Sequence, residues 1–452
     1  MDRVVPIILR SGRIFWLILV LLVCPLARAE LWSTAYYPGY RQSAMPASKV
    51  DFTALTHVIH FALLPNTDGT LDSSANSVTL ANSSDLVAKA HSAGKKVLIC
   101  VGGAGSSFVT ATSGTNMTKF TTNLVNFMVA RGYDGIDIDW EPIDSADTNQ
   151  FAIFINGLRT RLNTITPRPL LCAAVAWQPS LIASLQNQFD QINIMTYDMS
   201  GTWSGWVSWY NAPLYDGGYR FPSTGGLVPS TQSMVNTFTN AGVSPQKLGI
   251  GLAFYGKIWS GGVVNTTNGI TGPRQSWSTA PTLTTASFDS IMTTYYQSNL
   301  YHWDTNAQSA YLGLDNAGSS NDKFISYDDE HACQAKVSFA RNRRLGGIMI
   351  WELGEGYRAS QPVGQRDPLL QAVKQALAPP RLTGITRTNQ NIQVSFNSMP
   401  LALYRVQWNA NFGSTNWSTL TTNIVGDGGT LQVTDTNALL QARRFYRVQT
   451  PP

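Results

Sequence analysis

Short apolar segments alternate with amphipathic helical stretches over about 350 residues, from Leu31 to Ala378. Most of these segments are nearly continuous hydrophobic runs, as parallel strands buried on both faces require. Eight strands alternating with helices predict an α/β fold, a (β/α)8 TIM barrel. An open doubly wound sheet is the rival, but no Gly-x-Gly-x-x-Gly follows the first segment. The expected strands span residues 32–37, 56–64, 96–101, 135–141, 170–177, 191–197, 247–254 and 346–351.

Two segments depart from this alternation. Residues 257–327, rich in Thr, Ser, Asn and Tyr, predict an α+β subdomain inserted after the seventh strand, on the face where the loops after the strands gather. The barrel domain would then span residues 30–378. Ala378-Pro379-Pro380 has the composition of a stiff linker. Beyond it the apolar period changes to two, which predicts a small antiparallel β-sandwich over residues 381–452, a fibronectin III-like accessory module.

The first 29 residues have the pattern of a secretory signal peptide. Three arginines precede an apolar run of 11 residues, Ile14–Cys24, and Ala27-Arg28-Ala29 follows. A membrane span needs about 20 apolar residues, so an anchor is the weaker interpretation. We expect cleavage after Ala29, secretion, and no membrane segment in the mature chain.

The composition excludes several classes of protein. The formal net charge is +5 and only 13% of the residues are charged, so we expect no nucleic-acid partner. Three cysteines follow the signal segment, and an odd, small number does not describe a disulfide framework. The histidines lack metal-ligand spacing, and neither a phosphate loop nor a serine-hydrolase elbow occurs. We expect no metal and no cofactor, and a monomer.

The most informative segment is the acidic strand over residues 134–141, Asp-Gly-Ile-Asp-Ile-Asp-Trp-Glu. Because side chains alternate along a strand, Asp137, Asp139 and Glu141 share one face and three apolar residues share the other. In a barrel the apolar set faces the helices and the carboxyl groups face the interior. A solvated edge strand is the alternative, but its apolar flanks and its like charges disfavour it.

Crowded carboxyl groups cannot all ionise, so at least one is expected to hold a proton near neutral pH. Glu141, nearest the mouth of the barrel, is the natural proton donor. Residues two apart on a strand have Cα atoms about 7 Å apart, so Asp139 and Glu141 could flank one bond but not opposite faces of a sugar. The spacing therefore favours chemistry in which the substrate supplies the nucleophile.

At these residues the chain resembles glycoside hydrolase family 18, the chitinase family, whose signature is Asp-x-x-Asp-x-Asp-x-Glu on the fourth barrel strand. The pattern is complete from Asp134 to Glu141. Cys100 stands where the family has Ser before a Gly-Gly pair, and Pro142 directly follows the glutamate, where Tyr-Pro is common. Further segments agree with the family: Gly102-Gly103, Met195-Thr196-Tyr197-Asp198, Phe254-Tyr255-Gly256, Tyr327-Asp328-Asp329 and Trp351.

The resemblance implies a retaining reaction in which the N-acetyl group of the substrate is the nucleophile. Glu141 would protonate the glycosidic oxygen and later activate water. Asp139 would orient the acetamido nitrogen, and Asp137 would share its proton. Tyr197 would donate a hydrogen bond to the acetamido oxygen, and Asp198 would hold the sugar.

Aromatic residues at or just beyond the ends of the expected strands are the candidate sugar contacts. Sugar rings present apolar C–H faces that stack on aromatic rings, and the resemblance places Trp351 as the floor of the central subsite. Core packing is the alternative for most of the aromatic residues. The expected substrate-binding residues are Tyr37, Phe61, Gly102, Gly103, Trp177, Met195, Asp198, Tyr255 and Trp351.

The expected function is hydrolysis of β-1,4-linked N-acetylglucosamine polymers, with chitin or its oligosaccharides as substrate. One alternative is an endo-β-N-acetylglucosaminidase that cleaves the chitobiose core of glycans. Another is a non-catalytic chitin-binding lectin on the same barrel, which the presence of all three acids disfavours. The C-terminal module is a polysaccharide binder, a cell-surface binder or a spacer.

Overall fold

The computed structural model describes residues 31–264, 268–316, 321–399, 402–411, 413, 416–440 and 443–450. The expected signal peptide lies outside these residues. Within them, no helix has the length and apolar character needed to cross a membrane.

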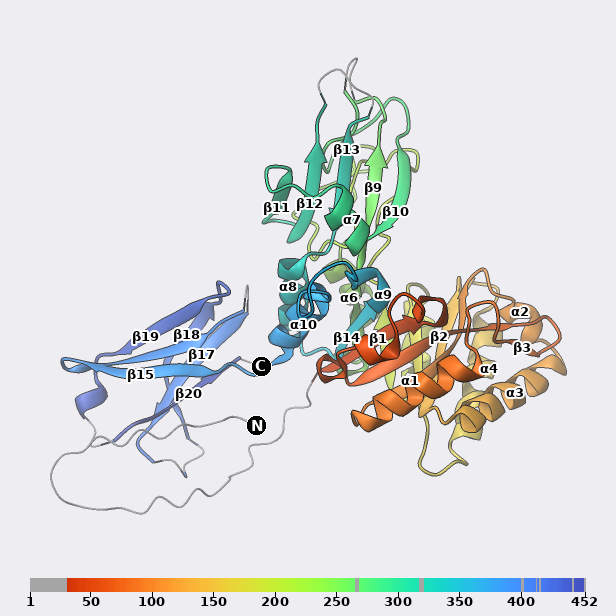
Figure 1. The fold of residues 1–452 in the computed structure, drawn as a ribbon, viewed down its shortest axis with the longest axis horizontal. Coiled ribbons are helices and arrows are strands. Elements are labelled where there is room, and N and C mark those ends of the chain that lie inside the picture. The colour runs from red at the N-terminus through yellow and green to blue at the C-terminus, as the bar shows by residue number, and fades with distance from the viewer. Residues whose placement is uncertain are drawn as a thin grey trace.

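Eight parallel strands form a closed barrel (Figure 1). The ring closes because β1 pairs with both β14 and β2, with Trp32 opposite Gly347 and Thr34 opposite His57. Each of the eight expected segments overlaps one of these strands, so the predicted fold is confirmed. The barrel strands are β1 (Trp32–Pro38), β2 (His57–Pro65), β4 (Lys96–Ala104), β5 (Gly135–Glu141), β6 (Leu170–Val175), β7 (Gln191–Ile194), β8 (Leu248–Ala253) and β14 (Gly347–Trp351).

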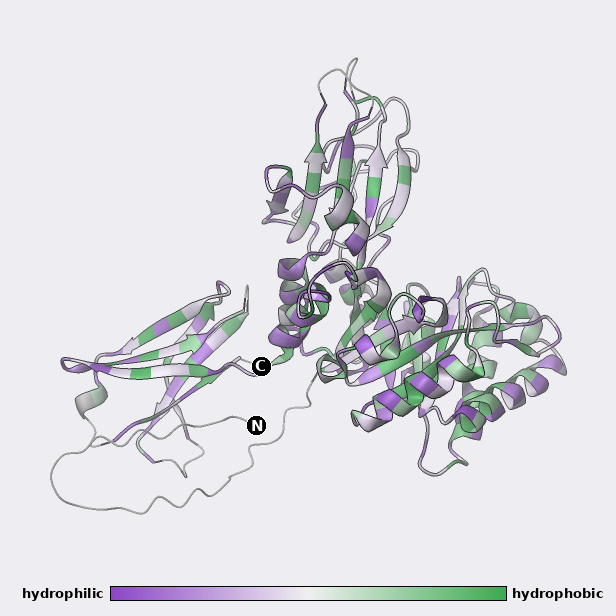
Figure 2. Ribbon diagram, in the orientation of Figure 1, coloured by the Kyte–Doolittle hydropathy of each residue, from purple (hydrophilic) through white to green (hydrophobic). Residues whose placement is uncertain are grey.

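Helices cover the outside of this barrel and bury one apolar side against it. In α1, Leu86, Val87 and Ala90 are buried at helical spacing, and Figure 2 shows hydrophobic and hydrophilic residues together along this helix. The helices between and after the strands are α1 (Leu80–Ser92), α2 (Phe108–Ala111), α3 (Asn116–Arg131), α4 (Thr148–Leu162), α5 (Pro179–Leu185), α6 (Thr231–Asn240), α8 (Glu330–Asn342), α9 (Leu353–Gly356) and α10 (Pro368–Leu377).

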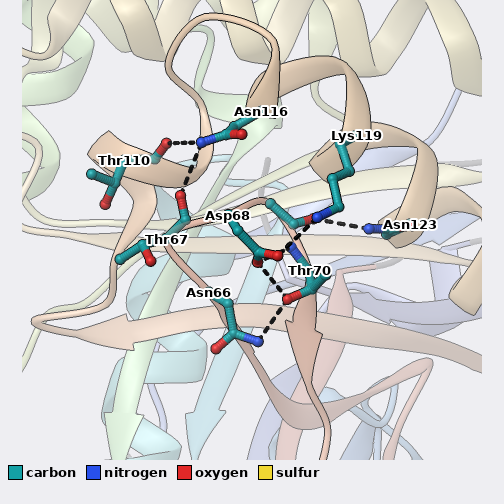
Figure 3. A network of polar contacts seen from close by, with 9 residues as sticks. Asn66, Thr67, Asp68, Thr70, Thr110, Asn116, Lys119 and Asn123 are labelled. Atoms are coloured by element: carbon teal, nitrogen blue, oxygen red, sulfur yellow. Dashed lines mark hydrogen bonds and ion pairs between the residues drawn. The ribbon is translucent and has the colours of Figure 1, made fainter.

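The loop that follows β2 is fixed to α3 by polar contacts (Figure 3). Lys119 Nζ lies 2.8 Å from Asp68 Oδ2, and Asn116 donates to the Thr67 carbonyl at 3.0 Å. Asn123 donates to the Gly69 carbonyl at 2.9 Å. Loops after parallel barrel strands lie at the mouth, so these bonds hold one part of the rim in a defined position.

Between β8 and α8 the chain forms a five-stranded antiparallel sheet, in the order β10-β9-β13-β12-β11. Its buried Trp259 and Phe324 pack with Trp209 and Tyr210, which come from the long segment between β7 and α6. The sequence did not reveal that this earlier segment belongs to the same core. The elements are β9 (Tyr255–Ser260), β10 (Thr282–Ser287), α7 (Phe288–Thr294), β11 (Tyr301–Asp304), β12 (Ser309–Leu314) and β13 (Lys323–Tyr327).

The C-terminal residues form two three-stranded antiparallel sheets, β15-β16-β19 and β18-β17-β20. Val394, Phe396, Tyr404 and Val406 belong to one buried cluster that both sheets supply. Alternating burial along β16 explains the period of two seen in the sequence. The strands are β15 (Leu382–Thr388), β16 (Asn391–Asn397), β17 (Leu403–Asn409), β18 (Ser418–Val425), β19 (Thr430–Asp435) and β20 (Phe445–Gln449).

Candidate active site

The acidic strand β5 carries its three carboxyl groups inside the barrel, as the alternation predicts. Asp137 is fully buried, Asp139 is 3% exposed, and Glu141 at the end of the strand is partly exposed. The alternate residues Ile136, Ile138 and Trp140 pack in the outer core with the helices. The three acids therefore form a column that rises from the closed interior towards the mouth, which we call the acid column.

Asp137 forms the base of the acid column. Its Oδ2 accepts a hydrogen bond of 2.7 Å from the Tyr36 hydroxyl, whereas its Oδ1 has no hydrogen-bond partner in the described part of the chain. Burial raises the pKa of Asp137 to about 6, against the lowering effect of Tyr36 and Cys100. This carboxyl group therefore holds its proton at a pH where an exposed aspartate has lost it.

Asp139 and Glu141 are the two upper acids of the column. Two carboxyl groups this close do not readily ionise together, so at least one of them keeps a proton near neutral pH. Burial raises the pKa of both, and the charge of Glu141 raises that of Asp139 further. The pair thus keeps one proton next to the mouth, at the position where a general acid is needed.

Gly102 allows β4 to lie directly against the acid column. A Cβ atom there would lie 2.0 Å from the carbonyl oxygen of Asp139, and the residue has φ +125°. Gly103, with φ +109°, leaves room for the ring of Phe61, which lies 3.2 Å from where a Cβ would be. A side chain at either position would displace the site, which explains the Gly-Gly pair.

Aromatic rings form the floor beside the acid column. The Trp351 ring centroid lies 4.8 Å from that of Phe61 in an edge-to-face arrangement, and 5.1 Å from that of Tyr36. Met195, 8% exposed, belongs to the same inner cluster. Trp351 itself stays partly exposed, so its ring can contact a ligand in the barrel mouth.

Tyr197 and Tyr255 belong with Trp351 to one further cluster, and their own ring centroids lie 6.0 Å apart. The Tyr197 hydroxyl donates only a weak bond of 3.7 Å to the Met349 sulfur. Burial and the charges of Asp139 and Glu141 raise the pKa of Tyr197. Its hydroxyl therefore keeps its proton and remains available as a donor.

Asp198 lies at the rim, with 54% of its side chain exposed. Its Oδ1 pairs with Lys257 Nζ at 2.7 Å, and its backbone N–H donates to Asn211 Oδ1 at 3.1 Å. Asp198 has φ +54°, a conformation that aspartate tolerates better than most residues. Lys257 Nζ also lies over the Tyr255 ring, 5.8 Å from its centroid, so the same lysine links Asp198 at the rim to the aromatic residues of the site.

One expected sugar contact lies elsewhere. The prediction for Tyr37 is wrong: this residue is fully buried in the outer core, and its hydroxyl donates to the Met45 carbonyl. Its neighbour Tyr36 is the residue that faces the interior. Trp177 follows the end of β6 and is 50% exposed, so its role as a sugar contact stays a prediction.

Several site residues were not recognised from the sequence. They are Tyr36 and Cys172 beside Asp137, Lys257 and Asn211 beside Asp198, and the pair Arg41 and Glu355. Arg41 Nη2 lies 3.1 Å from Glu355 Oε1, and burial together with Glu352 raises the pKa of Glu355 to about 7. Only Lys257 carried a signal, because it lies on the strand that begins with the Tyr-Gly pair of the family pattern.

Comparison with known proteins agrees with this geometry. The model of glycosyl hydrolases family 18 matches residues 33–356. The chain belongs to this family. Chitinase A1 of Niallia circulans is 29% identical over 391 residues, which cover 74% of this chain and 52% of that protein. The chain thus matches about half the length of this relative. A class V chitinase of Arabidopsis thaliana is 25% identical over 354 residues, covering 74% of this chain and 88% of that protein.

A solved structure of another protein has the same fold as this chain. The Group IV chitinase of Ostrinia furnacalis superposes with a TM-score of 0.66 at 21% sequence identity, covering 77% of this chain and 100% of that one. The comparison covers the barrel and supports the (β/α)8 architecture.

Proposed function

We propose that this chain hydrolyses β-1,4-linked N-acetylglucosamine polymers, chitin or its oligosaccharides, with retention of configuration. The observation that carries the proposal is the acid column, which runs from buried Asp137 to partly exposed Glu141 and is joined through Tyr36 to the Trp351 floor. Relatives named as chitinases support the substrate class. One similar structure contains allosamidin and another an N-acetylchitooligosaccharide.

In the first step, Glu141 gives its proton to the glycosidic oxygen while the bond from that oxygen to C1 breaks. The carbonyl oxygen of the substrate's own acetamido group forms the new bond to C1, which produces an oxazolinium ion. The Asp139 carboxylate accepts a hydrogen bond from the acetamido N–H and balances the positive charge. The Tyr197 hydroxyl donates to the acetamido oxygen and orients it for attack.

In the second step, the Glu141 carboxylate takes a proton from water as the water oxygen attacks C1 and the bond to the acetamido oxygen breaks. Two displacements at C1 leave its configuration as it was. Asp137, buried and partly protonated, shares the proton that Asp139 must release before it can act as an anion. The three acids lie on one face of β5, and this placement suits the order of proton transfers described.

We also propose how the chain is divided into domains. Residues 30–378 would be the catalytic barrel with an insertion at about 257–327, and residues 381–452 an accessory module. Secretion after cleavage at Ala29, and action as a monomer, belong to the same proposal.

The deciding experiment is a mass-spectrometric and NMR analysis of products from defined N-acetylglucosamine oligomers. We expect shorter oligomers whose new reducing end first appears as the β-anomer. Glu141→Gln should remove turnover and leave oligomer binding in place. Release from a glycoprotein but not from chitin oligomers would support the chitobiose-core alternative, and binding without turnover by the wild type would support a lectin.

A further inference from the structure

Two thiols flank the base of the acid column. Cys100 on β4 and Cys172 on β6 are the register partners of Asp137 on the two strands that pair with β5. Both cysteines are fully buried, and neither forms a disulfide. Both belong to the inner cluster that also contains Tyr36. Since partners in parallel register point to the same face of a sheet, both thiols face the Asp137 carboxyl group.

The titratable groups around Asp137 come from β1, β4, β6, β5 itself and the segment after β7. Tyr36 on β1 donates to Oδ2, and Tyr197, three residues beyond the end of β7, is near enough to be influenced by the Asp137 charge. Asp139 is the next acid on the same strand, and its pKa rises because of Asp137. Together with the thiols of Cys100 and Cys172, these neighbours are phenols, thiols and a carboxyl group.

A thiol is a weak hydrogen-bond donor compared with a hydroxyl. Tyr36 is therefore the one strong donor in the described surroundings of Asp137, and Oδ1 is left without a partner. Cys100 favours the charged form of the carboxyl group only as the smallest of three effects, after burial and Tyr36. A fully buried carboxylate with one strong donor is poorly stabilised.

We propose that Cys100, with Cys172 on the other side, is a positioning residue that sets the pH at which the acid column releases its proton: as a weak donor, its thiol stabilises the Asp137 carboxylate less than a hydroxyl and more than an alkyl side chain would. The inference rests on the proposed function for its catalytic consequence. Its physical content, a weak thiol donor placed beside the Asp137 carboxyl group by strand register, does not depend on substrate.

Serine and alanine at position 100 should shift, in opposite directions, the pH at which the acid column releases its proton. Serine adds a stronger donor, which favours the charged form and releases the proton at lower pH. Alanine removes the donor altogether, so the column should hold its proton to higher pH. A merely structural role for Cys100 would change stability but would not produce shifts of opposite sign.

The test is the pH dependence of kcat/KM on an N-acetylglucosamine oligomer. For Cys100→Ser we expect the basic limb to move down by roughly 0.5–1 pH unit, and for Cys100→Ala to move up. Cys333→Ser is the matched control, since Cys333 is equally buried but lies on α8. Shifts of the same sign in both variants, or shifts no larger than in Cys333→Ser, would overturn the proposal.

A second readout separates this proposal from the proposed function. The infrared S–H stretching band of Cys100, identified by its loss in Cys100→Ser, should change as Asp137 titrates in the absence of substrate. A band that responds to pH in a protein without turnover would support the thiol–carboxyl contact while the proposed function fails. A band that does not respond would reject the contact even in an active enzyme. Cys172→Ser, measured in the same way, replaces Cys100→Ser if that variant does not fold.

Discussion

The two faces of β5 are both buried, yet they affect the stability of the fold in opposite ways. On the outer face, Trp140 stacks on Phe108 at 4.6 Å and meets Phe151 edge to face at 5.6 Å. Removing such apolar surface from water stabilises the fold. On the inner face, burial raises the pKa of Asp137 and of its neighbours, so each ionised acid there opposes folding. The outer layer thus supplies the stability that allows a destabilising inner face to exist.

The largest effect should come from the outer face. Trp140→Ala removes a large buried ring, and we expect a loss of about 3–5 kcal/mol in unfolding free energy. Activity per folded molecule should fall far less, because the ring points away from the acids. Urea unfolding with parallel activity measurements checks this. Trp177→Ala, at an exposed tryptophan, is the control and should leave unfolding unchanged; equal losses in both variants would contradict the comparison.

On the inner face, Asp139→Asn should affect chemistry rather than stability. The amide cannot balance the positive charge of the oxazolinium ion, so we expect kcat to fall by about 10²–10³. Thermal unfolding should occur at the same or a higher temperature, because asparagine cannot ionise in this buried position. A variant that loses both activity and several degrees of stability would show that this face also supports the fold.

The pH dependence of stability gives a sharper test at Asp137. Its pKa is raised from 3.8 to about 6, so the stabilising effect of the bound proton is complete below the lower value and is lost as the pH rises through the upper one. Asp137→Asn cannot ionise. Relative to wild type it should therefore gain stability between about pH 4 and pH 8, by at most about 3 kcal/mol. Calorimetry at about pH 4 and about pH 8 measures the difference in stability between Asp137→Asn and wild type. An equal difference at the two pH values would contradict the assignment.

The smallest expected effects distinguish the roles of Tyr36 and Tyr37, which are adjacent on β1. Tyr37→Phe loses one hydrogen bond in the outer core, and we expect about 0.5–1.5 kcal/mol lower stability with unchanged kinetics. Tyr36→Phe loses the bond to Asp137, and the basic limb of its activity profile should move to higher pH. Matched pH profiles and unfolding curves distinguish the two, and identical behaviour would contradict the inward and outward assignment.

The sequence predicted the barrel and the acid column because both leave strong periodic signals. Eight apolar runs can close only in a few ways, and alternation on β5 separates acids from apolar residues without ambiguity. On β1 the same reasoning fails. Tyr36 and Tyr37 are both aromatic and both buried, so the pattern does not show which one faces inward; the register with β2 and β14 decides it.

The remaining parts of the site depend on contacts distant in sequence. Lys257 reaches Asp198 across about 60 residues, and Asn211 approaches it from a long segment without regular structure. Such contacts are set by how the loops at the mouth fold together, which composition and periodicity do not encode. Cys100 could be read as a buried small residue, but its place opposite Asp137 followed only from strand register.

The five-stranded sheet begins and ends on neighbouring strands, with Gly256 of β9 opposite Tyr327 of β13. A segment whose two ends meet can be exchanged as one piece without moving the barrel strands that flank it. During divergence, this block could therefore be replaced as a whole, while the acids on β5 kept their chemistry.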